Sequence, residues 1–222
     1  MNIEDTIRAV RERISAAACR AGRAESEVLL IGVTKRVDSD KIQEAVRAGL
    51  TDFGENYIQE AKKKIEGFEE KVCWHMIGHI QTNKLKYIPP LFDYVHSVDR
   101  LEIAEGLDKY GKPMNILFEL NLSREVSKHG TEEEGLRRML KKVVALKHVK
   151  PVGLMTMAPF VDDPEEVRGV FASLRNILGR ANREFGLDMK ELSMGMSSDF
   201  EVAIEEGSTM VRVGTAIFGE RT

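Results

Sequence analysis

Short apolar segments alternate with longer amphipathic segments along the whole chain. The apolar, β-rich segments that we expect to be strands are residues 28–35, 52–56, 72–78, 94–99, 115–122, 151–157, 192–197 and 210–218. The intervening segments place apolar residues at helical spacing, and several begin with an acidic or hydroxyl residue and end at glycine, as 38–49 and 163–186 do. Strands that alternate with helices predict βαβ units and a parallel sheet.

The number of these units predicts the fold. Eight strand–helix units indicate an α/β protein with a (β/α)₈ TIM barrel, and an open, doubly wound sheet is the alternative. Residues 1–22 have the pattern of an additional amphipathic helix. Only residues 219–222 follow the last apolar segment, so we expect the last helix to be missing or very short and no C-terminal β domain. Because no linker or composition shift interrupts the chain, we expect one domain over residues 1–222.

Composition and charge narrow the classes of partner. Hydrophobic residues make up 42% of the 222 positions, which is enough for a globular core. The formal net charge of −3 offers no global attraction to nucleic acid or to an anionic membrane, and no apolar run is long enough to span a bilayer. The N-terminal segment is not a signal peptide, and Cys19 and Cys73 lie far apart, so we expect reduced thiols and a cytoplasmic protein.

A lysine stands at the end of the first apolar segment. In barrel enzymes the functional groups sit at the carboxyl ends of the strands, where Lys35 would project into the barrel mouth. Burial there would lower the pKa of the lysine and leave a neutral amine that can attack an aldehyde. The alternative is a structural lysine that pairs with an acid such as Glu55.

The last two expected strands end in groups suited to phosphate. Loops after the seventh and eighth strands of barrels often bind phosphate through backbone N–H groups, and here they offer hydroxyls and close-approach backbone at Ser197, Ser198, Gly214 and Thr215. Arg212 would lie on the same side of its strand as Gly214, although a structural ion pair explains it equally well. An aldehyde-reactive lysine with a phosphate site predicts pyridoxal 5′-phosphate (PLP) as cofactor.

The motifs GVTK, FGENYIQE, WHMIGHIQTNK, HSVDR, GLMTMAP and LSMGMSSDFEVAIEEGSTMVRVGTAIFG together resemble the pyridoxal phosphate homeostasis protein family, also called the YggS or PROSC family. The resemblance runs through almost the whole chain and implies a fold-type III barrel like that of alanine racemase. It implies that Lys35 holds PLP as a Schiff base, the internal aldimine, and that Ser197, Gly214 and Thr215 hold the phosphate. It further implies that Arg212 faces the pyridine nitrogen and that Asn56 lies beside the ring.

The resemblance also implies a role in vitamin B6 balance. We expect the chain to store PLP and deliver it to PLP-dependent apo-enzymes, without strong catalytic turnover and as a monomer. A weak PLP-dependent amino-acid racemase and a Schiff-base aldolase acting on a sugar phosphate are the alternatives. The chain departs from the family pattern at Arg36-Val37-Asp38, and at Ser198, where an aspartate is common.

Histidine and cysteine near the third expected strand are candidate metal ligands. Residues four apart on a strand, such as His75 and His79, are about 13 Å apart, too far for one ion. Cys73 and His75 share a face but are only two ligands, so we expect no metal site. His79 is expected either to line the cofactor mouth or to cap the following helix.

Overall fold

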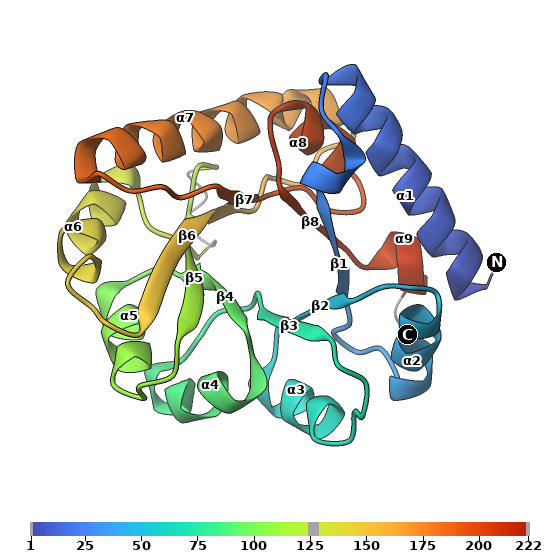
Figure 1. Cartoon of the computed structure of the whole chain (residues 1–222). Coiled ribbons are helices and arrows are strands. Elements are labelled where there is room, and N and C mark those ends of the chain that lie inside the picture. The colour runs from blue at the N-terminus through green and yellow to red at the C-terminus, as the bar shows by residue number, and fades with distance from the viewer. Residues whose placement is uncertain (1, 124–128, 221–222) are drawn as a thin grey trace.

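A computed structural model of the chain describes residues 2–123 and 129–220, and its strands form one closed barrel. Neighbouring strands are parallel and follow one another in sequence order, and β8 pairs with β1 (Figure 1). The (β/α)₈ prediction is confirmed, and the open-sheet alternative is wrong. The strands are β1 (Leu29–Val33), β2 (Asp52–Glu55), β3 (Cys73–Met76), β4 (Tyr94–Val98), β5 (Met114–Leu120), β6 (Val149–Thr156), β7 (Glu191–Ser193) and β8 (Met210–Val213).

Helices surround the ring of strands. The α-helices are α1 (Ile3–Arg20), α2 (Ser39–Arg47), α3 (Ile58–Ile65), α4 (Ile88–Leu91), α5 (Leu101–Asp108), α6 (Glu133–Val143), α7 (Arg168–Phe185), α8 (Phe200–Glu205) and α9 (Thr215–Phe218). Short 3₁₀ helices are η1 (Glu25–Glu27), η2 (Thr82–Tyr87) and η3 (Pro164–Val167). Among the described residues, no helix combines the length and the apolar character needed to cross a bilayer.

The additional N-terminal helix packs on the outside of the barrel. Its apolar stripe, which includes Ile7, Val10 and Ile14, is buried, and the helix lies against α8, α9 and α2 (Figure 1). Asn2 caps it by accepting a hydrogen bond from the backbone N–H of Asp5 at 2.7 Å. The helix thus covers the outer side of β8 and β1, where α9 alone, with four residues, is too short to do so.

Several strands are shorter than the sequence predicts at their carboxyl ends. β1 stops at Val33, and Lys35 lies in the turn beyond it. The expected strand over 210–218 is a strand followed by a helix, because the backbone turns into a helical conformation at Gly214 and α9 begins. β7 likewise ends at Ser193, and residues 194–197 form a loop. The groups that we predicted at strand ends are therefore carried on loops and helix starts.

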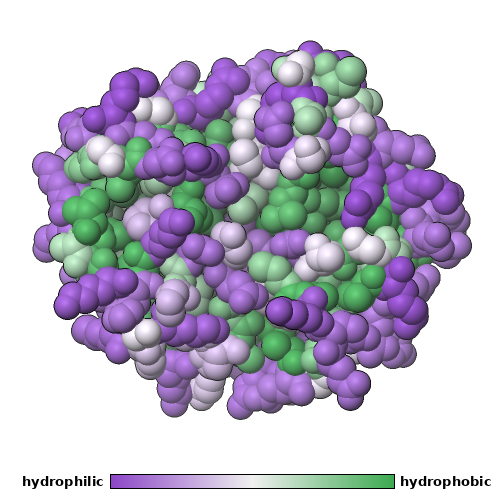
Figure 2. Space-filling view, viewed as in Figure 1, coloured by the Kyte–Doolittle hydropathy of each residue, from purple (hydrophilic) through white to green (hydrophobic). Residues whose placement is uncertain are grey.

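Apolar side chains pack mainly between the strands and the helices. A much smaller apolar cluster, Ile31, Leu117, Met155 and Met210, lies inside the barrel. The remainder of the interior contains buried polar side chains, among them His75, His96, Ser193 and Arg212. On the face shown in Figure 2, hydrophilic residues dominate the rim and apolar residues show in the gaps between them. The inside of this barrel is therefore more polar than an ordinary protein core.

We predict that Gly153→Ala destabilises the barrel, since a Cβ at Gly153 would lie 1.9 Å from the Glu191 carbonyl oxygen on the paired strand β7. The clash with backbone cannot be relieved by a side-chain rotation, so the free energy of unfolding should fall by about 1–3 kcal/mol or more. Gly169→Ala is the matched control, because no atom lies within 4 Å of its added Cβ and the position is helical. Urea denaturation measures both, and equal stabilities would contradict the prediction.

Candidate functional site

A cavity of about 430 Å³ opens at the carboxyl ends of the strands. Its volume is within the usual range for small-ligand sites. The residues that line it are Val33, Lys35, Asn56, Ile77, Met157, Phe160, Met196, Ser197, Ser198, Arg212, Gly214 and Thr215. Every residue that the sequence predicted to bind a cofactor lines this one cavity, except His79.

A buried ion pair supports the turn that carries Lys35. Lys64 Nζ donates to the carbonyl oxygen of Thr34 at 2.5 Å and to Glu55 Oε1 at 2.8 Å. The Thr34 hydroxyl donates to the same Glu55 oxygen at 2.6 Å. Burial raises the pKa of Glu55, against the effect of Lys64 and Thr34, which favour the carboxylate. Glu55, which the sequence suggested as a partner for Lys35, is therefore paired with Lys64.

The residue after Lys35 adopts an unusual backbone conformation. Arg36 has φ 57°, in the left-handed region that side-chain-bearing residues rarely enter. Its N–H donates to the Glu60 carboxylate, which also pairs with Lys64 at 2.7 Å. The half-buried Lys35 thus sits on a tight turn that α3 holds in place.

Lys64 lies on the buried side of α3. The run Lys62–Lys64 reads as a solvated helix face, yet the Lys64 side chain is only 9% exposed. The buried positions of α3 are Ile58, Ala61 and Lys64, spaced by three residues. That spacing from Ile58 was the signal that could have placed Lys64 on the inner face of the helix.

Arg212 is buried in the barrel beneath the cavity. Its Nη1 donates to Ser193 Oγ at 2.5 Å and its Nη2 to the Thr156 carbonyl oxygen at 3.0 Å. Burial lowers the pKa of Arg212 to about 10, although the negative charges of Asp199 and Glu119 act in the opposite direction. The guanidinium therefore stays charged at neutral pH and offers a fixed cation to the cavity.

A chain of hydrogen bonds continues from Arg212 through the barrel. Ser193 Oγ lies 2.8 Å from His96 Nδ1, His96 Nε2 lies 2.9 Å from His75 Nδ1, and His75 Nε2 lies 3.0 Å from Asp52 Oδ1. Burial holds the pKa of His96 well below its usual value, so its ring is neutral. Burial of Asp52 alone would raise its pKa, but hydrogen bonds from His75 and Thr51 lower it, which keeps the carboxylate ionised.

The two ends of this chain fix the direction of its hydrogen bonds. Arg212 can only donate and an ionised Asp52 can only accept. With a neutral His75 ring, the Ser193 hydroxyl donates to His96 Nδ1, His96 Nε2–H donates to His75 Nδ1, and His75 Nε2–H donates to Asp52. Sequence reasoning missed His96, Ser193 and Asp52, because the pairing of side chains across a barrel depends on strand register.

The loop after β7 is tied to α9. Ser197 Oγ accepts a hydrogen bond from the backbone N–H of Ala216 at 3.3 Å, in the first turn of α9. Asp199 Oδ1 accepts from the Met196 N–H at 2.6 Å and closes the loop. Gly195 has φ 94°, and a Cβ there would meet Phe200 Cα at 2.9 Å. These contacts place the hydroxyls of the loop and the start of α9 together on one wall of the cavity.

Asn56 supplies an unsatisfied polar atom. It lines the cavity, and its buried Oδ1 has no hydrogen-bond partner. Gly78 permits the close approach of this segment, because a Cβ at Gly78 would lie 2.2 Å from the Asn56 carbonyl oxygen. Buried polar atoms are normally hydrogen-bonded, so Asn56 Oδ1 is available to accept a hydrogen bond from a ligand in the cavity. With a lysine, a fixed cation and a hydroxyl-rich wall, the donor set fits PLP.

His79 belongs to an adjoining cavity of about 400 Å³, which shares Asn56, Ile77 and Met157 with the first. Its ring stacks on His129 at 3.9 Å between centroids, and its Nδ1 lies 3.3 Å from Asp99 Oδ2. Burial and the neighbouring His129 lower the pKa of His79, although Asp99 opposes them. The helix-cap alternative is wrong, since η2 begins after Gln81 without a side-chain cap.

Comparison with known proteins places the chain among PLP-related barrels. Residues 7–222 match the family described as alanine racemase, N-terminal domain. Proteins named pyridoxal phosphate homeostasis protein from Aquifex aeolicus and Escherichia coli K12 are 42% and 39% identical, over 100% and 99% of this chain and 99% and 97% of their own lengths.

Solved structures agree with the sequence relatives. A structure of PipY from Synechococcus elongatus PCC7942 with PLP bound has a TM-score of 0.83 and 35% identity, and covers 95% of this chain and 100% of that chain. Alanine racemase from Corynebacterium glutamicum, at 18% identity and a TM-score of 0.72 over 100% of this chain and 64% of that one, shows the same fold. The chain therefore belongs to the family of pyridoxal phosphate homeostasis proteins, built on the barrel of the alanine racemase N-terminal domain.

Proposed function

We propose that this chain binds PLP covalently through Lys35 and acts in PLP homeostasis by storing the cofactor and delivering it. The observation that carries the proposal is the convergence of Lys35, Arg212, Asn56 and the Ser197 wall on one cavity. Relatives named for PLP homeostasis, and the PLP-bound structure of PipY, support the same cofactor. PLP-dependent apo-enzymes are the proposed recipients, and the proposed working form is one domain acting as a monomer.

Each wall of the cavity has a separate task in this proposal. Lys35 presents its amine from the tight turn after β1. Ser197, Ser198, Gly214 and Thr215 hold the phosphate through hydroxyls and the amides that begin α9. When bound, PLP supplies an aldehyde that links to an amine and a pyridine ring that can take up electron density.

In this proposal, Arg212 favours storage of PLP over turnover. Its guanidinium is charged at neutral pH and is held by Ser193 and Thr156. If the ring nitrogen of bound PLP faced this guanidinium, the positive charge would disfavour protonation of that nitrogen. The ring would then withdraw electrons poorly, which would suit a protein that holds the cofactor without consuming it.

The covalent link is tested with Lys35→Ala and with Lys63→Ala as a matched control, since Lys63 is exposed on α3. With added PLP, the unaltered protein and Lys63→Ala should show a violet absorption band, and borohydride reduction should fix the label on the peptide that contains Lys35. Lys35→Ala should lose both. A label spread over surface lysines, or an absorption band that persists in Lys35→Ala, would contradict covalent binding through Lys35.

Transfer and turnover assays separate storage from the alternatives. A storage protein should reactivate a PLP-dependent apo-enzyme and racemise amino acids slowly or not at all. An aldolase that acts on a sugar phosphate would show no violet band as purified, and a racemase would exchange the α-proton of its substrate with solvent at a catalytic rate.

We predict that Ser193→Ala weakens PLP binding, because it removes the acceptor that positions Arg212 and the link to His96. A hydrogen bond to a charged group contributes about 1.5–3 kcal/mol, so the Kd for PLP should rise by roughly tenfold or more, with a shifted absorption maximum. Ser173→Ala on α7 is the control, since that hydroxyl bonds only to the Gly169 carbonyl oxygen on the outside of the barrel. Absorbance titration measures both. An unchanged Kd and spectrum in Ser193→Ala would show that Arg212 does not depend on Ser193.

The raised pKa of the buried Glu119 makes the stability of the protein depend on pH. Burial raises the pKa of Glu119 to about 7 in the folded protein. The negative charge of Asp99 also raises this pKa, and the positive charge of Arg212 lowers it. Because the folded state holds this proton and the unfolded state releases it near pH 4.5, Glu119 lowers stability as the pH rises from 4.5 to 7. Glu119→Gln should therefore be more stable than the unaltered protein by about 2–3 kcal/mol at pH 8, and by much less at pH 5. Urea denaturation at both pH values checks this, and parallel pH profiles would refute it.

A further inference from the structure

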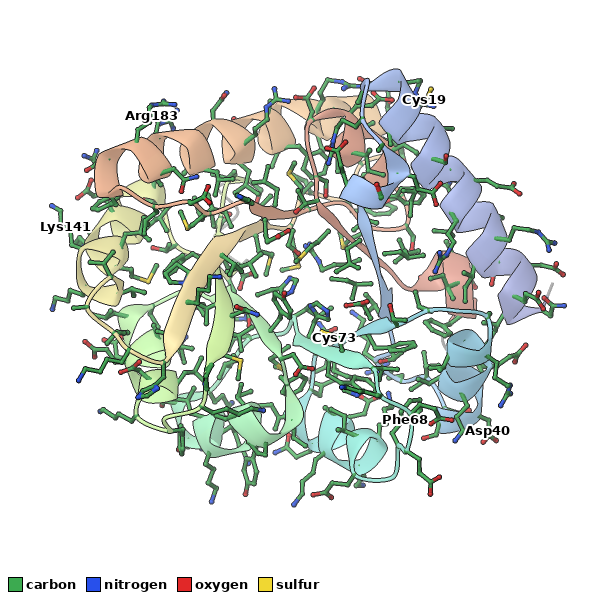
Figure 3. The ribbon with its side chains drawn as sticks, in the orientation of Figure 1. Cys19, Asp40, Phe68, Cys73, Lys141 and Arg183 are labelled. Carbon is green, nitrogen blue, oxygen red and sulfur yellow. The ribbon has the colours of Figure 1, made fainter. Side chains whose placement is uncertain are left out.

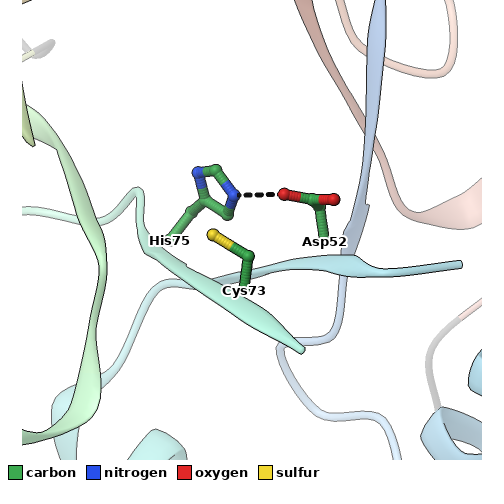
Figure 4. A group of neighbouring side chains, drawn as sticks. All are labelled: Asp52, Cys73 and His75. Atoms are coloured by element: carbon green, nitrogen blue, oxygen red, sulfur yellow. Dashed lines mark hydrogen bonds and ion pairs between the residues drawn. The ribbon is translucent and has the colours of Figure 1, made fainter. Parts of the chain in front are cut away.

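Three potential metal ligands lie together at the amino-terminal end of the barrel, away from the cofactor cavity. Asp52 is the first residue of β2, and Cys73 and His75 are the first and third residues of β3. The register of the two strands places Asp52 opposite Cys73, and all three side chains point into the same space (Figure 4). Their donor atoms lie within 4.8 Å of one another.

We propose that Asp52, Cys73 and His75 bind a divalent transition metal, with Zn²⁺ as the best match. Carboxylate oxygen, thiolate sulfur and imidazole nitrogen are the donors that Zn²⁺ prefers, and three protein ligands leave a fourth position for water or a ligand. Cys73 and His75 alone were too few to predict a metal site from the sequence, and the third ligand, Asp52, comes from the neighbouring strand through parallel pairing.

Each proposed ligand is already oriented by a neighbour. His75 Nδ1 lies 2.9 Å from His96 Nε2, which leaves Nε2 toward Asp52, and the His75 ring stacks on Tyr94 at 4.8 Å. Asp52 Oδ2 accepts from the Thr51 hydroxyl at 2.7 Å, which leaves Oδ1 facing His75. Metal-binding histidines and carboxylates are typically held in this way by a second set of hydrogen bonds.

The local charge favours a cation. Asp93 lies beside the same thiol, with its Oδ2 accepting from the Trp74 N–H at 3.0 Å. Burial and the carboxylates of Asp52 and Asp93 raise the pKa of the Cys73 thiol, so without a metal the thiol keeps its proton. On binding, the metal forms bonds to sulfur, nitrogen and oxygen, and the thiol proton leaves to solvent. The proton on His75 Nε2 passes to Nδ1, and His96 shifts its own ring proton from Nε2 to Nδ1 so that its Nε2 accepts from His75.

The site is reachable from solvent. Cys73 is half-buried, and the Asp52 side chain is 13% exposed. Among the described residues, His79, Asp99 and His129 form a second group with close donor atoms, but His79 and His129 line the adjoining cavity and the group offers no sulfur. The two groups can therefore be told apart by a spectroscopic signal that only a thiolate gives.

The test uses Co²⁺ as a spectroscopic probe and Zn²⁺ as its competitor, on the full chain after treatment with a chelator. We expect one equivalent of Co²⁺ to give a near-ultraviolet thiolate-to-cobalt band, and one equivalent of Zn²⁺ to abolish it. Cys73→Ser should eliminate the band. Thr51→Ala should weaken metal binding by about tenfold, because it removes the support of Asp52.

Two variants serve as matched controls. Cys19 is exposed on α1 at the outside of the molecule, whereas Cys73 lies within the ring of strands (Figure 3), so Cys19→Ser should keep the band. His79→Asn should also keep it, since it alters only the second group. A band that is missing in the unaltered protein, that survives Cys73→Ser or that is lost in Cys19→Ser would overturn the proposal.

Thiol labelling gives an independent readout that does not need a folded variant. In the unaltered protein, Zn²⁺ should slow alkylation of Cys73 and leave alkylation of Cys19 unchanged, as measured by peptide mapping. Equal labelling of Cys73 with and without Zn²⁺ would refute metal binding at this site. Neither experiment uses PLP, so its outcome is separate from the test of Lys35.

Discussion

The hydrogen bonding of the buried guanidinium of Arg212 is the constraint on which the inside of the barrel depends. A charge in the interior costs several kcal/mol unless it is partnered. Ser193 and the Thr156 carbonyl oxygen accept from it directly, while Asp199 and Glu119 supply negative charge nearby. Ser193 is in turn hydrogen-bonded to His96, and His96 to His75. The described interior of the barrel is therefore largely polar and contains one small apolar cluster. One buried cation thus accounts for both the positive charge beneath the cavity and the polar side chains that fill the barrel.

Much of this organisation could be predicted from the sequence. Alternating strands and helices predict the barrel, and because the carboxyl ends of parallel strands meet at one rim, residues as distant as Lys35 and Thr215 were expected to lie together. The ion pair under the lysine turn was not predicted, because a run of three lysines usually faces solvent and only the helical spacing of Lys64 indicates otherwise. The Asp52–His75–His96 chain was beyond prediction, since it depends on register between strands, which one sequence does not fix.

The support of Lys35 resembles the support of Arg212 in one respect. In both places a second polar residue holds the segment that carries a basic side chain lining the cavity, Lys64 for Lys35 and Ser193 for Arg212. The turn at Lys35 is further constrained by the left-handed Arg36, which Glu60 holds through its N–H. The backbone that carries the lysine is thus fixed before any ligand arrives.

The direction of the hydrogen-bond chain has a consequence for communication across the barrel. With Asp52 accepting, each donor from Arg212 onward points toward the amino-terminal end. A cation on His75 Nε2 would place the ring proton on Nδ1, and His96 would then have to accept at Nε2 and donate from Nδ1 to Ser193. The bonds among Ser193, His96 and His75 would then reverse their direction without any movement of the backbone, whereas Arg212 would still donate to Ser193, which would accept from both neighbours. A metal at the amino-terminal end of the barrel would thereby change the hydrogen bonding of the serine that holds Arg212 beneath the cavity.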